Sequence, residues 1–366
     1  MDTIKIIAVN LYNVSCGLRK PYTFRGEVIS QRHSVLVQFI GDNGEMGFGE
    51  ASPLAGFSPE SLKKARHQMS FLANEWKNRN VPCKGEELVL FLRSAFDRNV
   101  NASSVIFAFE SAAITMVARF KEVAPCEILH AGSTRSVPSA GLLQGSVTEV
   151  VDEARRLKSR GYSVFKLKVG SKNISLDVQK VEETKLAIGP QGRLRLDADR
   201  SWHFDEALLF AQNIGKNQIE FIEDPCLSED QWNKFVLLSD IPVAADELLS
   251  STDNLSRKRM ETIPYLIIKP TVCGGVISAL QLMKKAAQNG QKVIISSSFE
   301  SGVGLRMLAN LACLSGQAAG LGTSEWLQED ILSQPLVTSG GIITVPALAM
   351  NVDLFRDDIK KALATY

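Results

Sequence analysis

The sequence is poor in the residues that build disulfide frameworks, zinc sites and histidine-based catalytic triads. Its 366 residues include six cysteines and four histidines, all scattered along the chain, and no Cys-x-x-Cys pair occurs. This pattern is typical of reduced, mostly buried thiols in a cytosolic protein. It argues against a Cys/His metal centre and against a triad that depends on histidine.

The chain also lacks an excess of one charge and a long hydrophobic run. Its formal net charge is +1, which provides no electrostatic footprint for nucleic acid or an anionic membrane surface. No uninterrupted apolar run approaches the roughly 18–20 residues that cross a bilayer. The first residues, MDTIKIIAVN, lack the apolar core and cleavage site of a secretory signal. We therefore expect a cytoplasmic protein with no nucleic-acid or membrane partner.

Hydrophobic periodicity divides the chain into two regions. Up to about residue 60 it alternates as in β-strands, and from about 58 to 120 it is helical, which predicts an α+β domain. Between residues 136 and 324, eight short apolar segments alternate with helical ones, which predicts a closed parallel barrel. An open doubly wound sheet is the rival, but no GxGxxG follows a strand and no phosphate-binding loop occurs. The tail at 339–355 is predicted to be a further β segment that returns to the first domain.

Charged residues recur at the ends of the predicted barrel strands. Five such residues are spaced by 29, 26, 23 and 23 positions, about one β/α unit each: Lys168, Asp197, Glu223, Asp246 and Lys269. A single acid after a strand is usually a helix cap. Capping does not readily give five charged residues in register, so we expect them at the C-terminal mouth, where barrel active sites lie.

The order of the strands predicts how these five side chains face one another. Lys168 and Lys269 come from the second and sixth of eight strands, so they should oppose each other across the mouth. Asp197, Glu223 and Asp246 come from the three strands between them. Three carboxylates without His or Cys are hard oxygen ligands suited to Mg²⁺. An acid–lysine salt-bridge network is the structural alternative.

A second lysine, Lys166, lies in the segment VFKLKVG and points to the same side as Lys168. The neighbouring positive charge and desolvation both favour a neutral amine at Lys168, which could then act as a general base. The natural reaction is removal of a proton α to a carboxylate, with a metal stabilising the enediolate.

Several motifs resemble the muconate-lactonizing subgroup of the enolase superfamily, namely KLK, LDADRSW, EDP, ADE and IKP. The resemblance covers essentially the whole chain, since GFGEASPLAGFSPESL resembles the subgroup's capping domain and ISSSFESGVGL its seventh-strand motif. It implies an α/β fold in which residues 126–330 form a modified (β/α)7β TIM-type barrel. An α+β capping domain would comprise residues 1–125, completed by 331–366. An early loop around Cys16 to Tyr22 would close over the substrate.

Within the subgroup, the chain most resembles the branch that makes o-succinylbenzoate for menaquinone. This resemblance also implies an activity. Asp197, Glu223 and Asp246 would bind Mg²⁺. Lys168 would take the α-proton of 2-succinyl-6-hydroxy-2,4-cyclohexadiene-1-carboxylate and return it to the departing hydroxyl, a carbon–oxygen lyase reaction. Lys269 would stabilise the enediolate by a cation–π contact. The partner is thus a small-molecule carboxylate, and the sequence predicts no oligomeric state.

Three further residues are candidates for substrate binding. Arg195 matches a substrate-contacting arginine of some members, and alternation places it one layer below Asp197. A structural ion pair inside the barrel is the alternative role for Arg195. Ser296 and Ser297, in the seventh-strand motif, are the other two candidates.

The chain departs from the family pattern at Asp199, where Asn is usual. Alternation directs Asp199 inward, where it could pair with Lys166 or change the pKa of a lysine. Two more acids, Asp224 and Glu247, stand next to proposed metal ligands and are expected to point elsewhere.

Two other activities and one non-catalytic role remain open from the sequence. An N-succinylamino acid racemase needs the same metal ligands and both lysines. A dipeptide epimerase typically carries Asp-x-Asp after the last barrel strand, where this chain reads GLGTSEW. A barrel that only binds a ligand would show no activity and no dependence on metal. Either enzyme would lose its activity on chelation and regain it when Mg²⁺ is restored.

Overall fold

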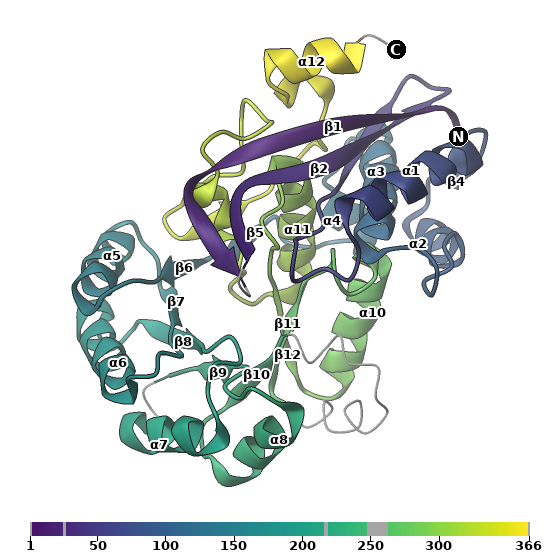
Figure 1. Ribbon diagram of the computed structural model, residues 1–366. Coiled ribbons are helices and arrows are strands. Elements are labelled where there is room, and N and C mark those ends of the chain that lie inside the picture. The colour runs from purple at the N-terminus through teal and green to yellow at the C-terminus, as the bar shows by residue number, and fades with distance from the viewer. Residues whose placement is uncertain (1, 25–26, 216–218, 247–262, 365–366) are drawn as a thin grey trace.

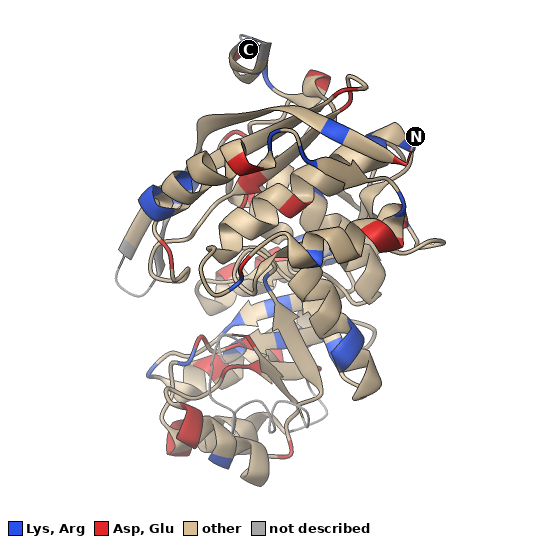
Figure 2. Cartoon of the chain, turned by 90° about the vertical axis from the view of Figure 1, so that its right-hand side faces the viewer, with Lys and Arg blue, Asp and Glu red and all other residues tan. Residues whose placement is uncertain are grey.

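The computed structural model describes residues 2–24, 27–215, 219–246 and 263–364. An antiparallel sheet with its helices lies above a curled parallel sheet with helices on its outer side (Figure 1). Charged residues of both signs gather where the parallel sheet faces the upper layer (Figure 2). The fold therefore brings two parts of the chain together over one charged region.

The upper sheet has four strands in the order β3-β2-β1-β4. Their bounds are Thr3–Phe24 for β1, Glu27–Gly41 for β2, Met46–Ala51 for β3 and Asn80–Pro82 for β4. The expected loop around Cys16 to Tyr22 is part of β1, although pairing with β2 is irregular between Gly17 and Tyr22. It lies against the barrel, since Gln328 N donates to Gly17 O at 2.8 Å.

Three helices pack on this sheet: α1 (Leu62–Trp76), α2 (Gly85–Ser94) and α3 (Ser103–Phe120). The short helix α4 (Pro125–Leu129) packs on α2, α3 and α11. Gly47 and Gly49 let α3 lie directly on β3, because a Cβ at either position would collide with a carbonyl oxygen of α3. Among the described residues α3 alone is long and apolar enough to cross a membrane, but it is 83% buried inside the protein. It is the core helix of the upper layer.

The parallel sheet contains seven strands in the order β12-β11-β10-β9-β8-β7-β6. They are β6 (Ala140–Leu143), β7 (Val164–Lys168), β8 (Arg193–Asp197), β9 (Phe221–Glu223), β10 (Val243–Ala245), β11 (Tyr265–Ile268) and β12 (Lys292–Ile295). The helices between and after them are α5 (Val147–Ser159), α6 (Ile174–Ile188), α7 (Phe204–Ile214), α8 (Glu229–Leu238), α10 (Gly275–Gln288) and α11 (Gly302–Ser315). This arrangement confirms the predicted barrel-type α/β fold with a cap.

The eighth predicted strand, residues 318–324, is replaced by two single bridges. Ala319 pairs with Ser139 beside β6, and Gly320 pairs with Ser296 beyond β12. Backbone hydrogen bonds of 2.9 Å from Ala140 N to Ala319 O and from Gly320 N to Ile295 O join the two edges. The segment then turns into a 3-10 helix, η2 (Gly322–Trp326), so it is too short to form a regular strand.

The C-terminal tail contacts both parts of the molecule. Its hairpin, β13 (Thr338–Ser339) and β14 (Ile342–Thr344), pairs with β5 (Ser136–Pro138) at the start of the barrel region, not with the first domain as expected. After η3 (Val352–Leu354) and before α12 (Asp357–Ala364), Phe355 packs on Phe48 of β3 with ring centroids 4.9 Å apart. Domain limits at residues 125 and 330 stay a prediction.

Candidate active site

A cavity lies at the C-terminal ends of the parallel strands, and its empty space, counted out into the open solvent, is about 940 Å³. The cap contributes Leu54 and Phe57 to its wall, and the loop after β12 contributes residues 296–299. The charged side chains that line it are Lys166, Lys168, Asp197, Asp199, Glu223, Asp224, Asp246 and Lys269. The cavity is thus lined by apolar side chains of the cap and by charged side chains of both signs from the barrel.

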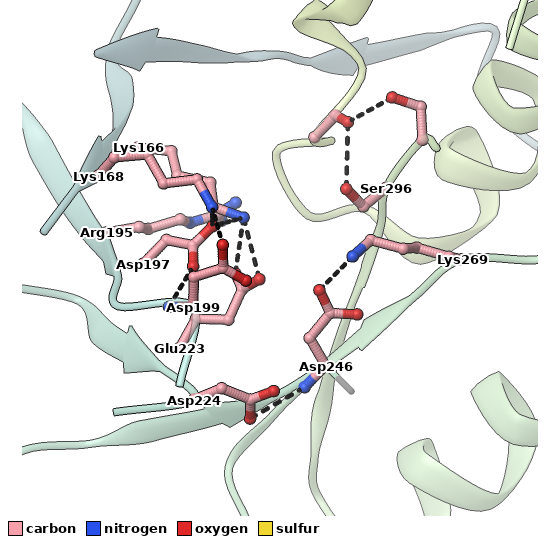
Figure 3. Close-up of polar contacts among 12 residues, drawn as sticks. Lys166, Lys168, Arg195, Asp197, Asp199, Glu223, Asp224, Asp246, Lys269 and Ser296 are labelled. Atoms are coloured by element: carbon pink, nitrogen blue, oxygen red, sulfur yellow. Dashed lines mark hydrogen bonds and ion pairs between the residues drawn. The ribbon is translucent and has the colours of Figure 1, made fainter. Parts of the chain in front are cut away.

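The strand ends hold the predicted charged residues where the sequence placed them. Lys168, Asp197 and Glu223 are the last residues of β7, β8 and β9 and lie in register with one another. Asp246 directly follows β10 and Lys269 directly follows β11. Figure 3 shows Lys168 and Lys269 on opposite sides, as predicted from the order of their strands.

The two lysines of β7 share carboxylates with the neighbouring strands (Figure 3). Lys166 Nζ lies 2.9 Å from Asp197 Oδ2 and 2.8 Å from Glu223 Oε2. Lys168 Nζ lies 2.8 Å from the same oxygen of Asp197. The repulsion expected between the two amines is therefore offset by an acid that contacts both.

The opposite wall holds a separate ion pair. Lys269 binds Asp246, and its Nζ lies 4.2 Å from the centre of the Phe57 ring. A cation this close to an aromatic face is attracted by it. Lys269 is thereby in contact with both the barrel and the cap.

Burial and neighbouring charges compete at each of these groups. Burial lowers the pKa of Lys166, but Asp197, Glu223 and Asp246 outweigh it and raise that pKa above its ordinary value. Burial raises the pKa of Glu223, and the negative charge of Asp197 raises it further. Burial also opposes ionisation of Asp197, yet Lys166 and Lys168 hold its pKa below the ordinary value. Crowded acids of this kind are stabilised by added positive charge.

The three strand-end acids fit Mg²⁺ by their chemistry. They offer hard oxygen ligands, and Glu223 Oε2 is buried without a hydrogen bond, although the amine of Lys166 lies 2.8 Å away. Within the described part of the chain, no three such side chains already surround one point. Lys166 lies between Asp197 and Glu223, and Asp246 is turned to Lys269. Binding a cation would require these amines to give up their acids.

The three candidate substrate contacts differ in position. Ser296 and Ser297 line the cavity, and Ser297 Oγ lies 2.7 Å from Thr323 Oγ1. Arg195 is 2% exposed, and its Nε lies 2.7 Å from Glu220 Oε2 while Nη1 donates to Ala318 O at 2.7 Å. Arg195 is not one of the described cavity-lining residues. Its position supports the alternative role of a structural ion pair.

Two acids next to the proposed metal ligands have left-handed backbone. Asp199, with φ of 49°, lines the cavity as alternation predicted, but it lies 3.8 Å from the amine of Lys168 and not beside Lys166. Asp224, with φ of 37°, lines the cavity although it was expected to point elsewhere. Its Oδ1 accepts from Asp246 N at 3.4 Å. Glu247 lies outside the described residues.

The apolar wall was not predicted from the sequence. Leu54, Phe57 and Phe299 line the cavity, and two of them belong to a cap loop far from the barrel in sequence. An aromatic residue inside the Gly/Pro-rich segment ASPLAGFSP was the available signal. Only the packing of the cap over the barrel shows that this segment reaches the site.

Two family models match the chain. "Enolase C-terminal domain-like" matches residues 149–349 and "MenC, N-terminal domain" matches residues 6–91. The o-succinylbenzoate synthase of Vibrio cholerae serotype O1 (strain M66-2) is 30% identical over 86% of this chain and 88% of its own. That of Aliivibrio fischeri (strain ATCC 700601 / ES114) is 30% identical over 85% and 86%. Protein PHYLLO, chloroplastic, of Arabidopsis thaliana is 29% identical over 83% of this chain, which spans only 20% of that protein's length.

Solved structures with low sequence identity share the fold. The muconate lactonizing enzyme from Pseudomonas fluorescens, complexed with muconolactone, has a TM-score of 0.82 at 22% identity and covers 98% of each chain. The L-Ala-D/L-Glu epimerase from Bacillus subtilis has a TM-score of 0.80 at 21% identity and covers 94% of this chain and 97% of its own. With the family models and the curated relatives, these matches show that the chain belongs to the enolase superfamily and, within it, to the o-succinylbenzoate synthase family.

Proposed function

We propose that this enzyme dehydrates 2-succinyl-6-hydroxy-2,4-cyclohexadiene-1-carboxylate to o-succinylbenzoate with Mg²⁺, in the cytoplasm, as a step of menaquinone biosynthesis. The observation that supports it is the placement of Lys168 and Lys269 on opposite sides of a cavity, with three strand-end acids between them. The 30% identity to o-succinylbenzoate synthases over most of both chains favours this substrate.

Lys168 performs the proton transfers in this proposal. Its neutral amine takes the proton from C1, the carbon α to the ring carboxylate, and the electron pair is delocalised into that carboxylate as an enediolate. The pair then forms the C1–C6 double bond as the C6–O bond breaks, and the ammonium gives the proton to the departing hydroxyl. The products are an aromatic ring and water, and the amine is regenerated. A positioned acid–base group contributes roughly 10²–10⁴-fold to such a step.

The remaining charged residues hold the substrate and its developing charge. Asp197, Glu223 and Asp246 would hold Mg²⁺. The cation would supply positive charge next to the substrate carboxylate and so lower the barrier to removal of the C1 proton. Lys269 presents an ammonium on the opposite side and favours the same negative charge. Before the cation binds, Lys166 orients Asp197 and Glu223 through its short contacts with both.

Racemisation of N-succinylamino acids is the second candidate. Two amines that face each other across a cavity are the arrangement that a two-base proton transfer needs, and that observation favours it. A dipeptide epimerase is less well supported, since Thr323 and Ser324 stand in the region where such enzymes carry Asp-x-Asp. Structural neighbours with that name are 21% identical and show the fold alone.

Assays with both substrates on the Mg²⁺-loaded enzyme test the proposal. We expect the absorbance of the cyclohexadiene to convert to that of o-succinylbenzoate. Racemisation of N-succinylphenylalanine is followed in parallel by loss of optical rotation. Absence of cyclohexadiene turnover together with rapid racemisation would replace the first candidate by the second.

A further inference from the structure

Arg32 is a buried arginine of the cap whose contacts join two loops of the cavity wall. It belongs to β2 and is 6% exposed. Its guanidinium donates to the cap loop at Ser52 O (2.8 Å), Ser52 Oγ (2.8 Å) and Pro53 O (3.2 Å). It also donates to the barrel loop at Ser298 O (3.3 Å) and Phe299 O (3.2 Å). All five contacts are therefore made to these two loops.

Both loops bear directly on the cavity. The cap loop, residues 52–58, places Leu54 and Phe57 in the wall, and Phe57 contacts the amine of Lys269. The barrel loop, residues 296–299, also lines the wall. Phe299 has φ of 61°, which is unfavourable for a bulky side chain and needs its surroundings to hold it. Arg32 helps to hold this conformation by donating a hydrogen bond to the Phe299 carbonyl.

A network of buried acids compensates the charge of Arg32. Glu300, which is 0% exposed, and Glu50, which is 1% exposed, both act on it electrostatically. Glu300 also accepts from Ser298 N at 2.6 Å and from Thr271 Oγ1 at 2.8 Å, two residues beyond Lys269. Glu50 accepts from Ser301 N and Gly304 N at 3.1 and 2.9 Å, at the start of α11. The cap thus holds the barrel loop at residues 298 and 299 and also holds the start of α11 that follows it.

We propose that Arg32 is a positioning residue that fixes the cap loop 52–58 against the barrel loop 296–299. It thereby sets the spacing of the two loops, which form the apolar wall that receives the non-reacting part of the substrate. The planar, five-donor guanidinium suits this role, because no other side chain donates in several fixed directions at once. Lys168, Asp197 and Glu223 stand on the other side of the cavity, so Arg32 acts on substrate binding and not on the proton transfer by Lys168. The identity of the substrate rests on the proposed function, but the coupling of the loops does not.

Hydrogen exchange measured by mass spectrometry on the full chain tests the coupling without any substrate. Arg32→Lys keeps the positive charge but loses the planar, five-donor guanidinium. We expect the amides of residues 52–58 and those of residues 296–304 both to exchange at least about tenfold faster. Arg98→Lys is the matched control. Arg98 also joins the cap to the barrel, through Gly274 and Ser278, but within the described part of the chain its hydrogen bonds reach neither residues 52–58 nor residues 296–304. Unchanged exchange in Arg32→Lys, faster exchange in only one loop, or equal effects in the control would overturn the proposal.

Steady-state kinetics then tests the consequence for the substrate. In Arg32→Lys we expect KM for the cyclohexadiene to rise about tenfold with kcat changed less than about threefold, the pattern of lost uniform binding. Arg98→Lys should leave both constants near those of the wild type. Ser52→Ala, which removes one contact and no charge, should show a smaller rise in KM and serves if Arg32→Lys does not fold. A fall in kcat at constant KM would refute the role of Arg32 in substrate binding. A wild type without turnover would refute the proposed function, and the exchange experiment alone would then decide whether Arg32 couples the two loops.

Discussion

Lys168 Nζ lies 2.8 Å from Asp197 Oδ2. The same oxygen lies 2.9 Å from Lys166 Nζ, so one carboxylate contacts two amines. The lysine at the end of β7 is in this way oriented toward the cavity by the acid at the end of β8. A base in this position is set by two adjacent strands and does not depend on a loop.

Replacement of Lys168 by Ala tests its role as the base. We expect kcat to fall by roughly 10²–10⁴-fold, because Lys166 is held between Asp197 and Glu223 and Lys269 lies on the opposite side of the cavity. Circular dichroism and thermal unfolding should show a folded protein, since the side chain is partly exposed in the cavity. Lys172→Ala, at an exposed position after the same strand, is the control and should retain activity. Turnover near that of the wild type in Lys168→Ala would remove Lys168 from the mechanism.

Removal of the metal tests the assignment of the three acids. Dialysis against EDTA should abolish turnover, and added Mg²⁺ should restore it. Because a cation that binds only the folded state stabilises it, Mg²⁺ should also raise the Tm of the metal-free protein. In Asp246→Asn we expect Mg²⁺ affinity, measured by calorimetry, to fall at least about tenfold. Asp240→Asn, an exposed acid before β10, should bind like the wild type. Equal affinities in the two variants would exclude Asp246 as a ligand.

The strand ends could be predicted because parallel strands repeat a fixed geometry. One β/α unit advances the chain by about 25 residues and brings it back to the same height, so spacing alone placed Lys168, Asp197 and Glu223 side by side. Opposition of Lys168 and Lys269 followed from the order of the strands. These relationships depend on local periodicity, which the sequence displays directly.

Other features could not be predicted because they depend on backbone conformation or on contacts distant in sequence. Alternation fails where the chain enters the left-handed region, and so it misplaced Asp224. The ion pair of Arg195 depends on Glu220, at the start of the next unit. Contact between Phe57 and Lys269 exists only because the cap packs on the barrel. No period in the sequence carries that information.

Glu110 makes part of the stability dependent on pH. It is 0% exposed, contacts Arg98 Nη2 at 2.8 Å and accepts from Ile277 N at 3.0 Å. Burial, only partly opposed by Arg98, raises its pKa from 4.5 to about 7. The folded state thus binds this proton more tightly than the unfolded state, so the contribution is complete below pH 4.5 and is lost as the pH rises through about 7.

Urea unfolding of the wild type and Glu110→Gln between pH 5 and 8 measures this contribution. We expect the wild type to lose free energy of unfolding relative to Glu110→Gln as the pH rises, by on the order of 3 kcal/mol over the full range. Only the difference between the two proteins is used, because other groups titrate in both. Glu182→Gln, at an exposed helical position, is the matched control. A constant difference for Glu110→Gln would mean that Glu110 keeps an ordinary pKa.

The tail stabilises the cap through Phe355, which is 0% exposed and packs on Phe48 of β3. Truncation of a fully buried Phe leaves a cavity, and we expect Phe355→Ala to lower the free energy of unfolding by about 3–5 kcal/mol. Leu348→Ala, in the same tail but 58% exposed, should change it by less than about 0.5 kcal/mol. Denaturant titration followed by tryptophan fluorescence, to which Trp76 in the cap core contributes, compares the two. A loss below about 1 kcal/mol in Phe355→Ala would show that the cap is stable without the tail, because a buried ring that stabilised it could not be removed at so small a cost.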